Sequence, residues 1–389
     1  MSGNIGIMAL SWFLFSLSSG LVTPFFSIYA KELGATDQDV ANIRALASLA
    51  LALTLPVGGV LTDKIGRVKT ILIGTVGVGI AQFIYATATD WRVFAAAWVL
   101  DSALHFYQPA LTAIVMDSLP KDKTFRGFLI LNIIPSTPSL FMPVAGGLLY
   151  DKFGVMGVRA GFIFMGIVTF IVFFLRLKGF KETFAAKDKE LSNLILELAG
   201  YRPILSKAFK IYLFTALLNQ VAFSVLNTYG AIYATQVVGL SKTEWGVITS
   251  FATLGGILGS ILLYAKNLSD SRKITVLSYV ISVSSMLALV LPLYFKVTPL
   301  VLFAIMFTTM NISGNIVGSA ISSVLTRVLP KEIRGRAVSI QRVLENIGAA
   351  LSSWIAGVLY TGLKPSEALE ICSLVGFSSA IYLYLVLRE

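Results

Sequence analysis

Long apolar segments alternate with short polar ones along this chain of 389 residues, and no other feature restricts the fold as strongly. Each segment has roughly 20 to 28 residues, and about 20 apolar residues in a helix cross the ~30 Å hydrocarbon core of a bilayer. A helix also satisfies its own backbone hydrogen bonds, as lipid requires. The sequence therefore predicts an all-α membrane protein with twelve transmembrane helices, at 4–30, 40–62, 70–89, 92–117, 127–149, 158–177, 208–235, 243–265, 274–294, 298–325, 336–360 and 367–387.

The composition agrees with a membrane protein and excludes several other classes. Hydrophobic residues make up 56% of the chain and charged residues 13%, whereas soluble domains carry roughly 25% charged residues. The net charge is +11, but Lys and Arg lie in short clusters between apolar segments, so we expect no nucleic-acid partner. Cys372 is the single cysteine and His105 the single histidine, so we expect neither a disulfide nor a metal site.

The basic residues are divided unequally between the two ends of the predicted helices. If both termini are cytoplasmic, the cytoplasmic segments carry 22 Lys and Arg and the external segments carry seven. Cytoplasmic loops of membrane proteins are enriched in these residues. We therefore expect a multi-pass protein of the cell membrane with both termini in the cytoplasm. The first apolar segment has no Lys or Arg before Lys31 and no small-residue cleavage signal, which favours a retained helix over a signal peptide.

An internal repeat divides the twelve helices into two sets of six. Residues 119–150 align without gaps with residues 329–360, and both copies cover the loop after a fourth helix and the fifth helix of a set. Such repeated halves are typical of transporters whose binding site lies between them. The identical pairs are Leu119 and Leu329, Pro120 and Pro330, Lys121 and Lys331, Arg126 and Arg336, Ile130 and Ile340, Gly147 and Gly357, Leu149 and Leu359, and Tyr150 and Tyr360.

A polar stretch at 178–207 separates the two sets. We therefore expect a six-helix bundle at 1–177, a cytoplasmic linker at 178–207 and a second, pseudo-symmetric six-helix bundle at 208–389. Within the linker, Leu191, Leu194, Ile195 and Leu198 share one helical face. This pattern indicates either an amphipathic helix on the membrane surface or a packed connector.

The loop between the second and third helices reads GGVLTDKIGRVK and closely resembles a signature of the major facilitator superfamily. The matching residues are Gly59, Leu61, Asp63, Lys64, Gly66, Arg67 and Lys69. Gly66 suits the tight turn of this loop if the turn requires positive φ. The resemblance implies a conformational latch between the halves, with Asp63 facing the positive end of helix 11 and Arg67 paired with Asp117. This latch would form in the outward-open state and break in the inward-open state. The other interpretation is that these charges only set the topology.

Two further segments resemble drug–proton antiporters of this superfamily. In the fifth helix, PSLFMPVAGG matches the antiporter motif at Pro143, Gly146 and Gly147. The prolines of this helix predict kinks, and its small residues predict close packing. The first helix is similar in Gly20, Pro24 and Tyr29, but Ala97 occupies the position of an arginine in the helix-4 motif of those exporters. The alternative interpretation is that the fifth helix is kinked but does not indicate the direction of transport.

Ionisable residues at membrane depth are candidates for proton coupling. Asp101 follows Arg92 by nine residues, or about 14 Å of helix, which places it near the midplane. Such residues usually face a cavity or a partner, because a lone charge there costs ~2.5–3.5 kcal/mol. His105 lies one turn later on the same face and either shares a proton with Asp101 or has a structural role. Glu345 is similarly deep in helix 11, and Arg342 on its face would form either a structural ion pair or part of the site.

The resemblance implies that helices 1, 4, 7 and 10 line a central cavity. Aromatic and amide side chains on these helices then favour amphipathic substrates, although each amide would equally suit a hydrogen bond between helices. Arg44, about one turn inside the second helix, either extends toward the membrane surface or attracts an anionic substrate group. The candidate substrate-binding residues are Arg44, Tyr107, Gln108, Asn219, Gln220, Asn227, Asn311, Asn315 and Arg342.

These features together predict a secondary active transporter, with proton-coupled efflux of drugs or amphipathic small molecules as the first hypothesis. The alternatives are a proton-coupled symporter or exchanger of a sugar, organic anion or other metabolite, and a non-transporting receptor or passive facilitator. No P-loop, nucleophile elbow or cysteine/histidine cluster is present in the sequence, so we do not expect an enzyme. We expect a monomer in the lipid bilayer that binds a small-molecule substrate, and no cofactor, since the proton gradient would supply the energy.

Overall fold

The computed structural model describes residues 3–119, 131, 133–183, 207–266, 272–328 and 334–386. Ten helices in these ranges are long and apolar enough to cross a membrane, which confirms the predicted all-α membrane fold. The predicted spans at 92–117 and 208–235 are each formed by two successive helices rather than one. The predicted linker helix with Leu191 and Leu198 lies outside the described residues.

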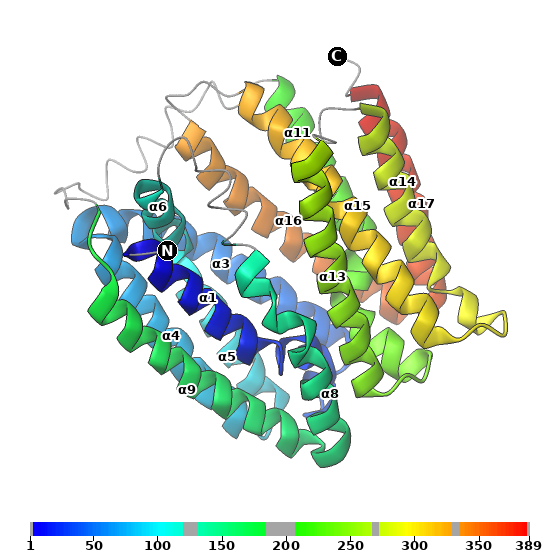
Figure 1. Cartoon of the computed structure of the whole chain (residues 1–389). Helices are drawn as coiled ribbons and strands as arrows, with labels where there is room; N and C mark the ends of the chain where they lie inside the picture. Colours follow the sequence, from blue (N-terminus) through cyan, green and yellow to red (C-terminus); the bar gives the residue numbers. More distant parts are fainter. Residues whose placement is uncertain are drawn as a thin grey trace.

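The helices before residue 183 pack mainly on one another. The central helix α4 contacts α9 and α5, while α1 lies along α9 and α3 along α5; they occupy one side of the molecule in blue to green (Figure 1). Their bounds are α1 Asn4–Ser19, α2 Phe26–Glu32, α3 Asp37–Ile65, α4 Arg67–Thr87, α5 Trp91–Leu104, α6 Gln108–Ser118, α8 Met142–Phe153 and α9 Val155–Gly179.

The helices after residue 207 form the other side of the molecule. Here α15 contacts α13 and α14, and α17 contacts α14 and α11. Their bounds are α11 Lys207–Ala222, α12 Ser224–Ile232, α13 Lys242–Lys266, α14 Arg272–Ala288, α15 Pro299–Val328, α16 Arg334–Gly362 and α17 Pro365–Val386.

The two sides meet through α3 with α16, α8 with α13, and α2 with α12. Glycines allow the second of these contacts, because a Cβ atom on Gly147 would collide with the backbone of Lys242, and one on Gly246 with the backbone of Pro143. Gly146 is equally tight against the backbone of Leu21. The close packing predicted for the fifth helix from its small residues is therefore confirmed.

Four of the predicted spans are interrupted near their middle, including 127–149, where a 3-10 turn at Pro138–Leu140 precedes α8. A 3-10 turn at Thr23–Phe25 separates α1 from α2, and a second one at His105–Tyr107 separates α5 from α6. Phe223 separates α11 from α12. Pro24 is the second residue of the turn at Thr23–Phe25, and Pro109 is the second residue of α6, positions where a missing N–H group costs least. Interruptions free backbone groups within a membrane, which is tolerated only where protein or a cavity surrounds them.

Both termini lie at one end of the molecule, which we call the terminal end; we call the other the distal end. At the terminal end, the side-chain amide of Asn4 at the start of α1 donates to the backbone oxygen of Lys181 at 2.9 Å, just beyond α9. The two sides of the molecule diverge toward the terminal end and converge at the distal end (Figure 1).

Candidate functional site

The two largest cavities described here share Asn311 and Asn315 of α15. One has a volume of about 490 Å³ and is lined entirely by residues of α11 to α15 and the Phe223 break. The other, of about 460 Å³, lies between α13, α15 and the segment that holds Ile133 and Ser136. A cavity of several hundred Å³ is large enough for a drug-sized molecule.

Amide side chains are concentrated in the larger cavity, as the sequence suggested. Asn219, Asn227, Asn311 and Asn315 all line it. The Asn315 amide donates to the Gly256 backbone oxygen at 2.8 Å, which ties α15 to α13. The side chains of Asn219 and Asn227 form no hydrogen bond within the described ranges, so their donors and acceptors are available to a ligand.

Several lining residues were missed in the sequence. Trp245, Tyr279, Phe307 and Met310 give the cavity its apolar and aromatic walls. Phe307 could have been found, because it lies one helical turn before Asn311 and therefore on the same face of α15. Trp245 and Tyr279 carry no such signal, since they lie on α13 and α14, which the family resemblance did not assign to the cavity.

Five candidate substrate residues line neither of these two cavities: Arg44, Tyr107, Gln108, Gln220 and Arg342. Tyr107 is buried beside Gly74 and Arg176 within the first set of helices. Gln220 donates to the backbone oxygen of Glu345 at 2.9 Å and joins α11 to α16. Gln108 begins α6 and lines none of the three cavities described here.

Arg44 lines a third, smaller cavity of about 140 Å³ between α3, α5 and α16. Its guanidinium carbon lies 5.7 Å from the centre of the Trp98 ring. The side chain thus points into the protein rather than toward the membrane surface. Asn346 of α16 lines the same cavity, so both sides of the molecule contribute to it.

Asp101 lies in the last turn of α5, facing α4. Its Oδ2 atom accepts a hydrogen bond from the Tyr85 hydroxyl at 3.2 Å, while Oδ1 is buried and has no hydrogen-bond partner in the described residues. His105 Nδ1 lies 2.7 Å from the backbone oxygen of Asp101 and 3.7 Å from Oδ1. The His105 side chain is 31% exposed and that of Asp101 14%, so the histidine is the more accessible of the two.

Glu345 is bonded within its own helix. Its Oε1 atom accepts a hydrogen bond from Gln341 at 2.7 Å. Arg342 lies on the same helix, but in the described part of the chain it forms no ion pair with Glu345. The ion pair considered in the sequence is therefore absent from this arrangement of the side chains.

The loop with the superfamily signature adopts the expected turn. Gly66 has φ of 91° and ψ of 163°, values that favour glycine. Arg67 forms an ion pair with Asp117 at the end of α6 and donates to Thr183 at 2.9 Å. Asp63 forms no hydrogen bond or ion pair within the described ranges. Gly59 has open space where a Cβ atom would lie.

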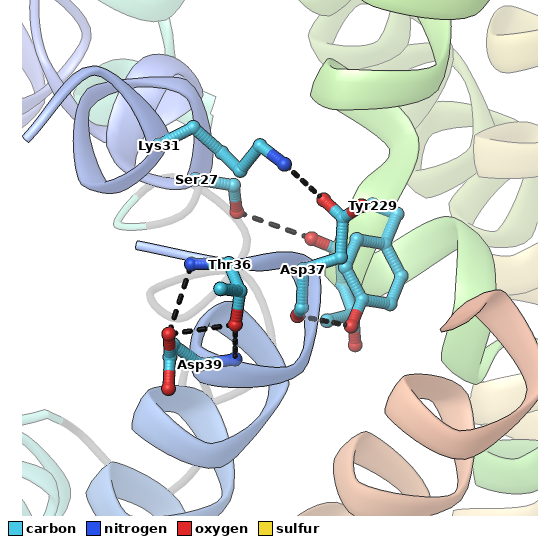
Figure 2. Close-up of polar contacts among 7 residues, drawn as sticks. Ser27, Lys31, Thr36, Asp37, Asp39 and Tyr229 are labelled. Carbon is cyan, nitrogen blue, oxygen red and sulfur yellow. Dashed lines mark hydrogen bonds and ion pairs between the residues drawn. The ribbon is translucent and has the colours of Figure 1, made fainter. Parts of the chain in front are cut away.

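Polar contacts between the two sides of the molecule close the distal end. Ser27 donates to the backbone oxygen of Thr228 at 3.1 Å, and the Tyr229 hydroxyl donates to the backbone oxygen of Asp37 at 2.6 Å (Figure 2). Lys31 pairs with the Asp37 carboxylate at 2.6 Å and holds the start of α3 in place. The distal end is thus closed by hydrogen bonds that join α2 and α3 to α12.

A second group of contacts joins α8 and α2 to the start of α13. Asp151 accepts hydrogen bonds from the backbone N–H groups of Lys242 at 3.2 Å and Thr243 at 2.8 Å, and from the Thr243 hydroxyl at 2.6 Å. The Lys242 ammonium group lies 3.2 Å from Glu32, which also accepts a hydrogen bond from Tyr150 at 2.7 Å. We call Glu32, Tyr150, Asp151, Lys242 and Thr243 the distal lock.

Comparison with known proteins agrees with this architecture. The model of the Major Facilitator Superfamily matches residues 8–353. The quinolone resistance protein NorA of Staphylococcus aureus is 24% identical over 265 residues, which span 67% of this chain and 65% of NorA, just under two thirds of its length. The multidrug resistance protein MdtG of Salmonella arizonae is 25% identical over 316 residues, covering 76% of this chain and 74% of MdtG.

A similar solved structure extends the agreement to the fold of the whole chain. It is a bacterial homologue of the human lysosomal transporter Spinster in an inward-facing, unoccupied conformation. It has a TM-score of 0.75 at 14% identity and covers 99% of this chain and 96% of its own. The family match covers most of the chain and agrees with the expectation of a transporter. The chain therefore belongs to the major facilitator superfamily and is a multi-pass membrane protein.

Proposed function

We propose that the protein is a proton-coupled exporter of amphipathic small molecules. The observation that carries this proposal is the cavity of about 490 Å³, whose walls combine aromatic rings with the amides of Asn219 and Asn227. Aromatic and apolar walls with few polar groups bind molecules of mixed polarity without demanding one shape. The partial matches to NorA and MdtG, a quinolone and a multidrug resistance protein, support the same class.

Alternating access would operate by rocking the two sets of helices against each other. Asn311 and Asn315 connect this cavity to the second one, which residues of both sets line. The terminal end faces the cytoplasm in this proposal, and the closed distal end faces outward, so the structure corresponds to an inward-open state. The lack of a polar partner for Asp63 in the described residues is consistent with a latch that is broken in this state. The Arg67–Asp117 pair lies within one set of helices and would persist.

Asp101 is our candidate for the proton carrier. The Tyr85 hydroxyl can donate a hydrogen bond to the carboxylate, and Oδ1 is left for a proton. His105 lies 3.7 Å from Oδ1, is the more exposed of the two side chains and can pass a proton on. Glu345, which Gln341 holds by a hydrogen bond, is the second candidate.

A proteoliposome experiment tests the proposal. Purified protein is reconstituted with ethidium as the transported dye, and a pH gradient is imposed. Dye flux should follow the pH gradient. Asp101→Asn should abolish the gradient-driven flux and leave dye binding unchanged. Asp90→Asn is the matched control, because Asp90 caps α5 through the backbone of Arg92 and is exposed.

The outcomes separate the hypotheses. Full gradient-driven flux in Asp101→Asn would contradict the role of this residue and move the coupling to Glu345. Flux that ignores the gradient in the wild type would indicate a passive facilitator, and dye binding without any flux would indicate a receptor. A second candidate function, exchange or symport of an organic anion, is favoured by the inward position of Arg44.

A further inference from the structure

The small cavity around Arg44 lies where both sides of the molecule meet. Residues spaced along one face of α3 provide Arg44, Ser48 and Leu51, whereas α5 provides Trp98 and Ser102. Asn346 of α16 completes the wall. The cavity therefore contains one cation, one flat aromatic face, and hydroxyl and amide groups that can donate hydrogen bonds.

Arg44 differs from the other inward-facing arginines in its lack of partners. Arg176 is buried but donates to Thr75 at 2.7 Å and approaches Ser11, and Arg159 donates to the Ala88 backbone oxygen at 2.6 Å. Within the described ranges Arg44 forms no hydrogen bond and no ion pair; the Trp98 ring lies against its guanidinium group, and Tyr229 is close enough to interact with its charge.

Two acidic groups on the helices that form this cavity are already engaged. The Asp37 carboxylate, at the start of the same helix, pairs with Lys31 at 2.6 Å. The Asp101 carboxylate, on α5, is bonded to Tyr85 and faces α4. A cation at membrane depth without a counterion is costly, and the contact with Trp98 offsets part of that cost. An anion that entered the cavity would supply the missing partner.

We propose that this cavity binds the carboxylate of a small aromatic anion, as part of the substrate or as the whole of it. The guanidinium group donates two parallel N–H bonds to a carboxylate, while Trp98 offers a flat face for the attached ring. The volume of about 140 Å³ suits a carboxylate on one small ring and excludes a large ring system from this part of the site.

The inference rests on the proposed function, since it assigns a substrate class to that transporter. It also ties the ligand to the transport cycle. Arg44 belongs to one side of the molecule and Asn346 to the other. Opening of the distal end would separate these two side chains, so the anion would be held by both only in the closed arrangement.

The test measures equilibrium binding without any gradient. Full-length protein in lipid nanodiscs is titrated with benzoate, with benzamide and with benzylammonium, and heat and Trp fluorescence are recorded. Wild-type protein should bind benzoate saturably, with quenching that disappears in Trp98→Phe, and should bind the neutral and cationic analogues at least tenfold more weakly. Arg44→Gln should weaken benzoate binding at least tenfold, and Arg44→Lys at least threefold because the bidentate geometry is lost.

The matched control is Arg92→Gln. Arg92 also lies over a tryptophan ring, that of Trp91 at 5.0 Å, but it is 74% exposed and remote from the cavity. Its replacement removes the same charge and should leave benzoate binding unchanged. Gel filtration and thermal unfolding establish that each variant is folded. If Arg44→Gln does not fold, the benzoate affinity of Arg44→Lys decides the test.

Two results would overturn the proposal: no saturable benzoate binding to wild type, or equal benzoate binding by wild type and the folded Arg44 variant. The outcome of the benzoate titration is independent of the outcome of the dye experiment. Benzoate binding without gradient-driven dye flux would leave the anion site intact and refute the exporter. Gradient-driven dye flux in the wild type, together with no saturable benzoate binding to the wild type, would refute the anion site alone.

Discussion

Replacing Asp151 with alanine should open the distal end of the molecule. Asp151 ends α8 on one side and accepts three hydrogen bonds from the start of α13 on the other. The start of α13 does not depend on these bonds for its own capping, because Ser241 and Glu244 bond to each other's backbone N–H groups at 2.8 and 3.1 Å. The bonds to Asp151 therefore stabilise only the arrangement in which the distal end is closed.

The magnitude follows from the nature of these bonds. The carboxylate acts as an additional helix cap, and replacing such a cap with alanine costs 0.5–2 kcal/mol. Three bonds to a charged acceptor favour the upper end of this range, although exposure of Asp151 to water moderates it. A loss of about 2 kcal/mol changes the ratio of closed to open distal ends by roughly 30-fold. A wild-type ratio of about 100 to 1 would thus fall to about 3 to 1.

Double electron–electron resonance, which measures the distance between two spin labels, can detect this shift. Cys372 is the one free cysteine in the sequence, so Cys372→Ser gives a clean background. Labels at Met156, which is 65% exposed at the start of α9, and at Gln236, exposed beyond α12, report on the separation of the two sides. The longer distance should gain population in Asp151→Ala.

A capping aspartate that does not cross between the two sides is the control. Asp90 bonds to the backbone of Arg92 within its own set of helices at 2.7 Å, so Asp90→Ala should leave the distances unchanged. A distance distribution in Asp151→Ala that equals the wild type would refute the assignment of Asp151 to the distal lock. Equal shifts in both variants would show a general effect of lost capping instead.

Two further predictions use glycines with matched controls. Gly66→Ala should lower the free energy of unfolding by about 1–3 kcal/mol, because Gly66 has a φ of 91°. Gly59→Ala should leave it unchanged, because the added atom has open space around it. Thermal unfolding in detergent measures both variants, and equal unfolding temperatures would contradict the prediction. Gly246→Ala should push α13 from α8 and lengthen the same distal distance, because the new Cβ atom meets the backbone of Pro143. Gly314→Ala is the control and should leave this distance unchanged, because its new Cβ atom meets nothing within 4 Å. An unchanged distance in Gly246→Ala would contradict the close packing of α13 on α8.

The sequence was sufficient where local chemistry decides the outcome. Hydropathy located the membrane helices, because insertion depends on the composition of each segment alone. The loop signature indicated a tight turn that Gly66 would suit and a carboxylate partner such as Asp117 for Arg67; the turn has positive φ at Gly66, and the pair is present. These features depend on a single turn and on two charges at adjacent helix ends.

Neighbouring amides show where sequence reasoning ends. Asn219 lines the large cavity, but Gln220, the next residue, is used in a bond to α16. Tyr107 looked suited to a cavity and is instead packed against α4. Trp245 and Tyr279 bring aromatic walls from helices that had given no sign of lining a cavity.

The sequence by itself determined that this chain forms membrane-spanning helices of one transporter superfamily, together with the side chains that share a face of each helix. Only the tertiary structure decided which of those faces meet a cavity, which meet another helix, and that Asn346 of the second set lines the same cavity as Arg44. The physical reason is that lipid and protein interior are similarly apolar, so hydrophobicity does not tell one face from another. The direction of each face is set by the packing of the helices, through contacts between residues far apart in the chain.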